Sequence, residues 1–152
     1  MSHARRIAIL VLAWAPAVLI MAVIFLASSE HHPVIVTDPS VDVVMKKAGH
    51  FAGYALLGIA VAIGLTLTVD VRRGGVGRIT ADLGRWTFVA AWAIATAYAC
   101  TDEFHQVFVS GRTPSVVDVG IDSLGAATGV ALFAWWVRRR RRTFAEAPSE
   151  AS

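Results

Sequence analysis

The chain has 152 residues, of which 56% are hydrophobic and 16% are charged, and its mean hydropathy is +0.60. This composition excludes an ordinary soluble domain and predicts a single integral membrane domain. The formal net charge of +3 comes from arginine clusters in short hydrophilic segments, so it signals membrane topology and we expect no nucleic-acid partner. The single cysteine, Cys100, excludes an internal disulfide and a thiolate metal site.

The first apolar stretch, residues 7–27, is nearly uncharged. About 20 residues at 1.5 Å per residue cross the ~30 Å hydrocarbon core of a bilayer. Basic residues before it and Ala27-Ser28-Ser29 after it also resemble a signal peptide, but the run exceeds the roughly 7–15 apolar residues of such peptides. We therefore expect a retained transmembrane helix.

The second apolar stretch, residues 48–69, follows a segment whose prolines and turn-forming residues predict a loop at 28–47. Within this loop, His31 and His32 form a solitary adjacent pair, so we do not expect them to bind a metal. The second span therefore begins close to residue 48.

A polar stripe opens the second span. Its residues are three or four positions apart, which places them on one face of a helix. They are Lys47, His50, Tyr54 and Gly58. This stripe should face protein, although His50 and Tyr54 would also suit a membrane interface with their polar tips in water.

The third and fourth spans are expected at residues 86–101 and 115–137, and a connector rich in Gly and Arg at 70–85 precedes them. Thr113-Pro114-Ser115 supplies an N-cap and a proline for the first turn of the fourth helix. One face of that helix should point at protein, and its glycines should let a neighbouring helix come close. The residues of this face are Asp118, Asp122, Gly125 and Gly129.

The distribution of basic residues predicts the orientation. Eleven of the 14 Lys and Arg residues lie in the N-terminal segment, the 70–85 connector and the run after Val137. The positive-inside rule places these segments in the cytoplasm, which requires an even number of spans. We therefore predict an all-α bundle of four transmembrane helices with both termini cytoplasmic. Residues 1–137 would form the membrane domain, and 138–152 a basic stop and a disordered cytoplasmic tail.

This topology brings two polar segments to the outer face, where their side chains form a candidate functional cluster. Ionisable groups at this depth are costly, so their presence indicates a site, with solvated loop residues as the alternative. Arg112 offers a planar fork suited to phosphate or carboxylate, while His50 and His105 can carry a proton near neutral pH. The members are Asp102, Glu103, His105, Gln106, Arg112, Lys47, His50, Tyr54, Asp118 and Asp122.

A structural role would account for part of this cluster. Asp102 and Arg112 would satisfy each other as an ion pair. Asp118 would suit a capping box, because Ser115 precedes it by three positions. Neither a zinc-type H-E-x-x-H motif nor a G-x-S-x-G nucleophile motif is present. The residues leave catalytic roles, any metal and any cofactor unassigned.

Two motifs carry a family resemblance, KKAGHFAGY at 46–54 and the more specific DEFHQVFVSGR at 102–112, followed by Asp118. With them, the chain resembles the VanZ-like family of small bacterial membrane proteins over about residues 7–137. The resemblance implies a bacterial cytoplasmic (inner) membrane location and a cell-envelope role. The founding member of that family is linked to reduced susceptibility to teicoplanin, a lipid-tailed glycopeptide, without a settled biochemical mechanism.

Three hypotheses follow for a chain whose immediate surroundings are the lipid bilayer. The first is a non-catalytic protein that binds an anionic or lipid-linked envelope ligand. The second is a membrane enzyme in which Asp102, Glu103 and His105, with His50 as a further candidate, perform acid–base or metal-assisted chemistry on a lipid head group. The third is a partner protein, whose face at Gly125 and Gly129 packs against another membrane protein or a second copy.

Overall fold

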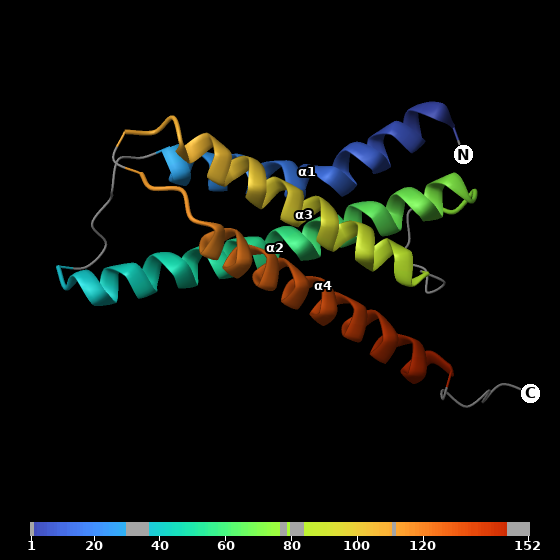
Figure 1. Cartoon of the computed structure of the whole chain (residues 1–152). Coiled ribbons are helices and arrows are strands. Elements are labelled where there is room, and N and C mark those ends of the chain that lie inside the picture. The colour runs from blue at the N-terminus through green and yellow to red at the C-terminus, as the bar shows by residue number, and fades with distance from the viewer. Residues whose placement is uncertain (1, 30–36, 77–78, 80–83, 111, 146–152) are drawn as a thin grey trace, which may run out of the picture.

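The computed structural model describes residues 2–29, 37–76, 79, 84–110 and 112–145. Its helices are α1 (His3–Ser29), α2 (Pro39–Arg72), α3 (Arg85–Gln106) and α4 (Val116–Ala145), as Figure 1 shows. The prediction of an all-α fold is confirmed. Among the described residues, three helices are long and apolar enough to cross a membrane, namely α1, α2 and α4.

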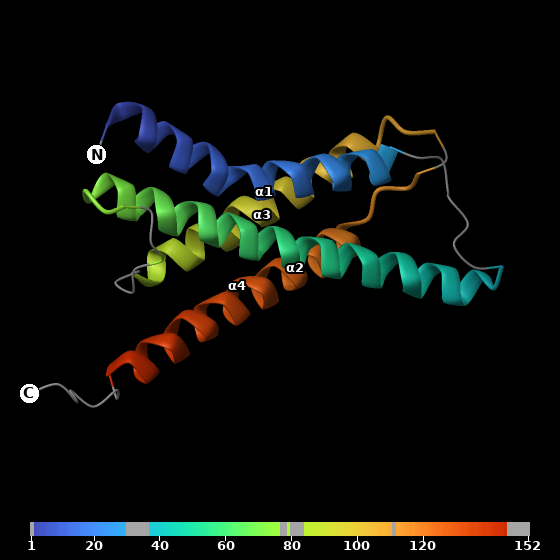
Figure 2. The same cartoon turned by 180° about the vertical axis from the view of Figure 1, so that it is seen from behind.

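Successive helices run in opposite directions along the bundle (Figures 1 and 2). The two ends of the bundle therefore gather different helix ends. The N-terminus, the end of α2, the start of α3 and the end of α4 lie at one end. The opposite end gathers the end of α1, the first half of α2, the end of α3 and the start of α4. The polar segments singled out in the sequence all belong to this second end.

Helix α2 begins earlier than the sequence predicted, and α1 ends later, so the loop expected at 28–47 is wrong for residues 28–29 and 39–47. The Asp38 side chain accepts hydrogen bonds from the N–H groups of Ser40 at 2.9 Å and Val41 at 3.4 Å. Pro39 occupies the first turn, where its missing N–H costs nothing. The same residue types that form turns also start helices, and here they start one.

Two further helix ends extend the expected spans. Helix α3 continues past residue 101 to Gln106, which places Asp102 and His105 on a helix. Helix α4 continues through the arginine run at 138–142, where we expected it to end, and reaches Ala145. Some predicted segments lie outside the described residues. They are residues 146–152 of the expected tail, His31 and His32, and most of the connector between Gly77 and Leu83.

Small residues hold the helices close together. A Cβ atom added at Gly58 of α2 would lie 2.5 Å from the carbonyl oxygen of Ala126 in α4. A Cβ added at Gly125 or Gly129 of α4 would overlap the carbonyl oxygens of Phe51 or Ala55 in α2. The predicted close approach is therefore confirmed, and α2 itself occupies the glycine face that a second protein would otherwise use.

Helix α3 packs through alanines. Ala91, Ala95 and Ala99 are fully buried. The Tyr98 hydroxyl donates to the carbonyl oxygen of Met21 at 2.6 Å, which ties α3 to α1. These contacts fix the end of α3, where the polar residues lie.

Replacing Gly129 with valine should destabilise the bundle, because the added side chain would meet the Ala55 carbonyl group. Overpacking of this kind costs about 1–3 kcal/mol. Gly120→Val is the matched control, since a Cβ atom at Gly120 has no neighbour within 4 Å. Unfolding in detergent micelles titrated with SDS compares the two variants, and equal stability would contradict the close crossing.

Candidate functional site

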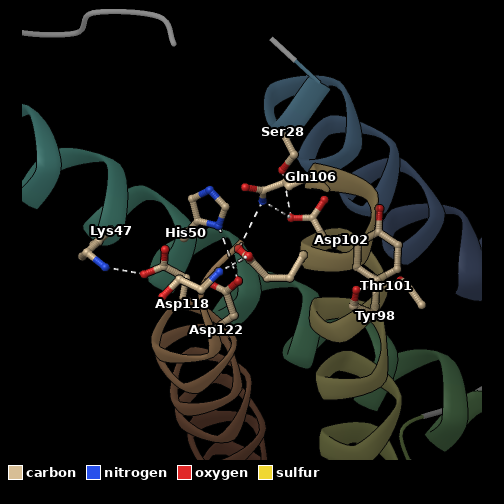
Figure 3. A network of polar contacts seen from close by, with 11 residues as sticks. Ser28, Lys47, His50, Tyr98, Thr101, Asp102, Gln106, Asp118 and Asp122 are labelled. Carbon is tan, nitrogen blue, oxygen red and sulfur yellow. Dashed lines mark hydrogen bonds and ion pairs between the residues drawn. The ribbon is translucent and has the colours of Figure 1, made fainter. Parts of the chain in front are cut away.

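The polar stripe of α2 meets the polar face of α4. Lys47 forms an ion pair with Asp118, and one turn further His50 Nδ1 lies 3.4 Å from Asp122 Oδ2 (Figure 3). Asp122 is fully buried, and so is Tyr54, the next member of the α2 stripe. The prediction that this stripe faces protein is confirmed. The residue further along α2, His50, meets the residue further along α4, Asp122. The two helices therefore run in the same direction, and their polar stripes face each other.

The acids at the end of α3 are held from other helices. Asp102 Oδ2 accepts a 2.8 Å hydrogen bond from the hydroxyl of Ser28 in α1. Gln106 Nε2 donates to Glu103 Oε1 at 3.2 Å and lies 3.5 Å from Asp102 Oδ2. Glu103 Oε2 accepts from the N–H of Ser115 at 2.8 Å, which joins α3 to the start of α4. With Ser28 of α1, the polar contacts around the cluster thus involve all four helices.

The two structural alternatives for this cluster take a different form in the structure. Arg112 Nη2 donates to the carbonyl oxygen of Ala27 at 3.1 Å, where the sequence suggested Asp102 as its partner. The side chain of Asp118 turns to Lys47 of another helix. The start of α4 is held through backbone bonds to the Ser115 carbonyl oxygen, including one of 3.0 Å from the Asp118 N–H.

A polar cavity of about 250 Å³ opens between these residues. Most of the predicted cluster lines it, and α2, α3 and α4 all contribute. Its lining consists of Val43, Lys46, Lys47, His50, Glu103, Gln106, Arg112, Thr113, Asp118, Ile121 and Asp122. The structure therefore brings these sequence-predicted residues to one place.

Three members of the predicted cluster lie outside this lining. Asp102 and Tyr54 are buried behind it, at 2% and 0% exposure. His105 turns toward α1, where its Nε2 lies 3.2 Å from the Ser29 hydroxyl and its ring packs 4.5 Å from that of Phe25. His105 thus contributes to the contact between α1 and α3, while His50 faces the cavity.

Four buried polar atoms at this end have no hydrogen-bond partner within the described part of the chain. They are Tyr54 Oη, Asp102 Oδ1, Asp122 Oδ1 and Arg112 Nε. Buried polar groups are normally hydrogen-bonded, because leaving one unpaired costs about 1–3 kcal/mol. Of the residues that carry these atoms, Arg112 and Asp122 line the polar cavity, whereas Tyr54 and Asp102 are buried behind it.

The basic side chains around the cavity differ in their partners. Lys46 pairs with Asp42 at 2.6 Å and Lys47 pairs with Asp118, so both lysines have carboxylate partners. Within the described part of the chain, Arg112 donates its hydrogen bond to a neutral carbonyl oxygen. No group of three or more His, Cys, Asp or Glu side chains in the described ranges is arranged to hold a metal ion.

Sequence reasoning missed several residues that build the site. Ser28, which holds Asp102, is 1% exposed. Its position at the end of a long apolar run was the available signal, since a polar residue there often marks a contact. The Ser115 N–H group, which holds Glu103, and the Asp42 partner of Lys46 gave no comparable signal, because each depends on which helices become neighbours.

The fold and the site define a small helical membrane protein with a polar, charged cavity at one end of its bundle. A family model described as VanZ/LLP1 matches residues 10–137, which is most of the chain. The chain therefore belongs to the VanZ-like family. No curated protein and no solved structure matches it significantly.

Removing His50 should destabilise the fold more than removing Lys47. His50→Ala leaves the fully buried Asp122 without its recorded partner, which should cost about 1–3 kcal/mol. Lys47 and Asp118 keep 40% and 32% of their side chains exposed, so Lys47→Ala should cost at most about 1 kcal/mol.

Chemical unfolding in micelles measures both effects. The double variant His50→Ala/Asp122→Ala should recover part of the loss, because it removes the stranded carboxylate as well. If the losses of stability from the two single variants simply added in the double variant, the contact between His50 and Asp122 would be contradicted.

Proposed function

We propose that the chain spans the bacterial cytoplasmic membrane four times, with α3 crossing it as well as α1, α2 and α4, and with both termini in the cytoplasm. Helix α3 has 22 residues, about 33 Å of helix, and its ends carry Arg85 and the polar cluster. The start of α1 and the end of α4 lie at the end of the bundle that carries most of the basic residues, in keeping with the positive-inside rule. Residues 1–137 would then be the membrane domain and 138–152 a cytoplasmic tail.

We further propose that the cavity binds an anionic, lipid-linked envelope ligand on the outer face. The observation that carries this proposal is the state of Arg112. Among the described residues, its Nη2 bonds the neutral carbonyl oxygen of Ala27 and its buried Nε has no partner. A guanidinium binds phosphate or carboxylate through parallel, charge-assisted hydrogen bonds. An anion on Arg112 would satisfy both its charge and its unused donor.

The carboxylates around the cavity indicate the rest of the head group. Glu103, Asp118 and Asp122 all line the cavity, and ionised carboxylates only accept hydrogen bonds. They would repel a second anionic group and would suit hydroxyl or ammonium donors. A phosphate that carries a hydroxylated or amino-bearing group matches both sides of the cavity.

A role in the cell envelope follows from this ligand class and from membership of the VanZ-like family. We extend to this chain the expectation that its expression lowers susceptibility to teicoplanin. The lipid tail of that glycopeptide would bring it to the same outer surface. Susceptibility of a sensitive host with and without the chain measures this effect.

Binding of dodecyl phosphate to the purified protein in dodecyl maltoside micelles tests the proposed site. Arg112→Gln should weaken binding about tenfold to hundredfold, because charge-assisted hydrogen bonds are lost. Arg85→Gln is the matched control, since Arg85 lies over the Trp86 ring at the opposite end of the bundle. Equal affinity of the wild type and Arg112→Gln would contradict an anion site at Arg112.

An enzyme that acts on a lipid head group is the second candidate. The observation that favours it is the pair of His50 and the buried Asp122 beside the cavity, an arrangement that can hold and transfer a proton. A lipid composition altered by the wild type and restored by Asp122→Asn would support catalysis. Unchanged lipids, together with binding that depends on Arg112, would favour the binding protein.

A further inference from the structure

A second cavity adjoins the polar one. It has a volume of about 310 Å³ and lies between α1 and α2. Its apolar walls include Val23 and Ile24 from α1 and Met45, Gly49 and Gly53 from α2. The volume falls at the lower end of the roughly 300–1,000 Å³ range of ligand pockets.

The two cavities share three lining residues, Lys46, His50 and Arg112. The two cavities are therefore neighbours, and the residue whose guanidinium we assign to the anion lines both of them. Val23 and Met45 are 58% and 49% exposed, so the apolar cavity opens onto the outer surface of the helices. In a membrane, that surface faces hydrocarbon chains.

From this geometry we infer that the ligand is a single amphiphile from the bilayer, a lipid phosphate bound in both cavities at once. Its phosphate lies at the junction beside Arg112, its polar head group enters the polar cavity, and its hydrocarbon chain lies between α1 and α2. The inference rests on the proposed anion site and adds the place of the chain.

The two glycines of this wall leave space for a chain. A Cβ atom added at Gly49 would meet no neighbour within 4 Å, and one added at Gly53 would lie 3.8 Å from Ile24 of α1. A hydrocarbon chain fits against such a surface by burying apolar area without meeting polar groups. A large side chain at Gly49 would occupy the same space and would compete with the chain.

The test compares two probes that share a phosphate but differ in chain, dodecyl phosphate and methyl phosphate, on the protein in dodecyl maltoside micelles. Gly49→Phe should weaken binding of dodecyl phosphate about tenfold, because several methylenes lose their buried contacts. It should leave the affinity for methyl phosphate within about twofold of the wild type. Val23→Phe, which fills the cavity from α1, should act in the same way.

The matched control is Gly120→Phe, since Gly120 is exposed on α4, lines neither cavity and has the same open space for a Cβ atom. This variant should bind both probes as the wild type does. Wild-type affinity for dodecyl phosphate in Gly49→Phe and Val23→Phe would overturn the chain site, and so would an equal loss of both probes. If neither probe binds the wild type, the proposed anion site itself fails.

Discussion

The close crossing of α2 and α4 is the constraint on which the site depends. Gly58 and Gly129 let the two backbones touch, which no larger side chain would allow without displacing a helix. The two helices run in the same direction, so one crossing fixes the register of both polar stripes. It places Asp118 against Lys47 and the buried Asp122 against His50. Without the crossing, an acid of α4 would face hydrocarbon, where a charge is very costly.

The remaining acids need the other helices for the same reason. Asp102 is held by Ser28 of α1, and Glu103 by the N–H group at the start of α4. Gln106 lies between these two carboxylates and donates toward both. Such a network is stable only when its members are satisfied, so the end of the bundle is specified as a unit. Four buried atoms at this end, Arg112 Nε among them, have no partner among the described residues, and the unused donor of Arg112 leads to the proposed ligand.

Much of this arrangement could be predicted from local spacing. Intervals of three and four residues identified the stripes on α2 and α4, and the glycine pair predicted the close contact. Local spacing gives the face of a helix but does not say which neighbour that face meets. For this reason His105 was expected in the cluster but packs on Phe25, and Arg112 was paired with Asp102 but bonds the Ala27 carbonyl oxygen. The start of α2 was missed because Asp38 and Pro39 suit a turn and a helix cap equally well.

An envelope ligand can reach the cavity only if the cavity faces the outer side of the membrane. A single cysteine at Thr113, which lines the polar cavity, in a Cys100→Ser background reports this directly. A cysteine at Gly84, the N-cap residue before α3 at the opposite end, serves as the comparison. In intact cells, a membrane-impermeant maleimide should label Thr113→Cys and spare Gly84→Cys until the membrane is permeabilised. The reverse pattern would place the cavity in the cytoplasm and would contradict an envelope ligand.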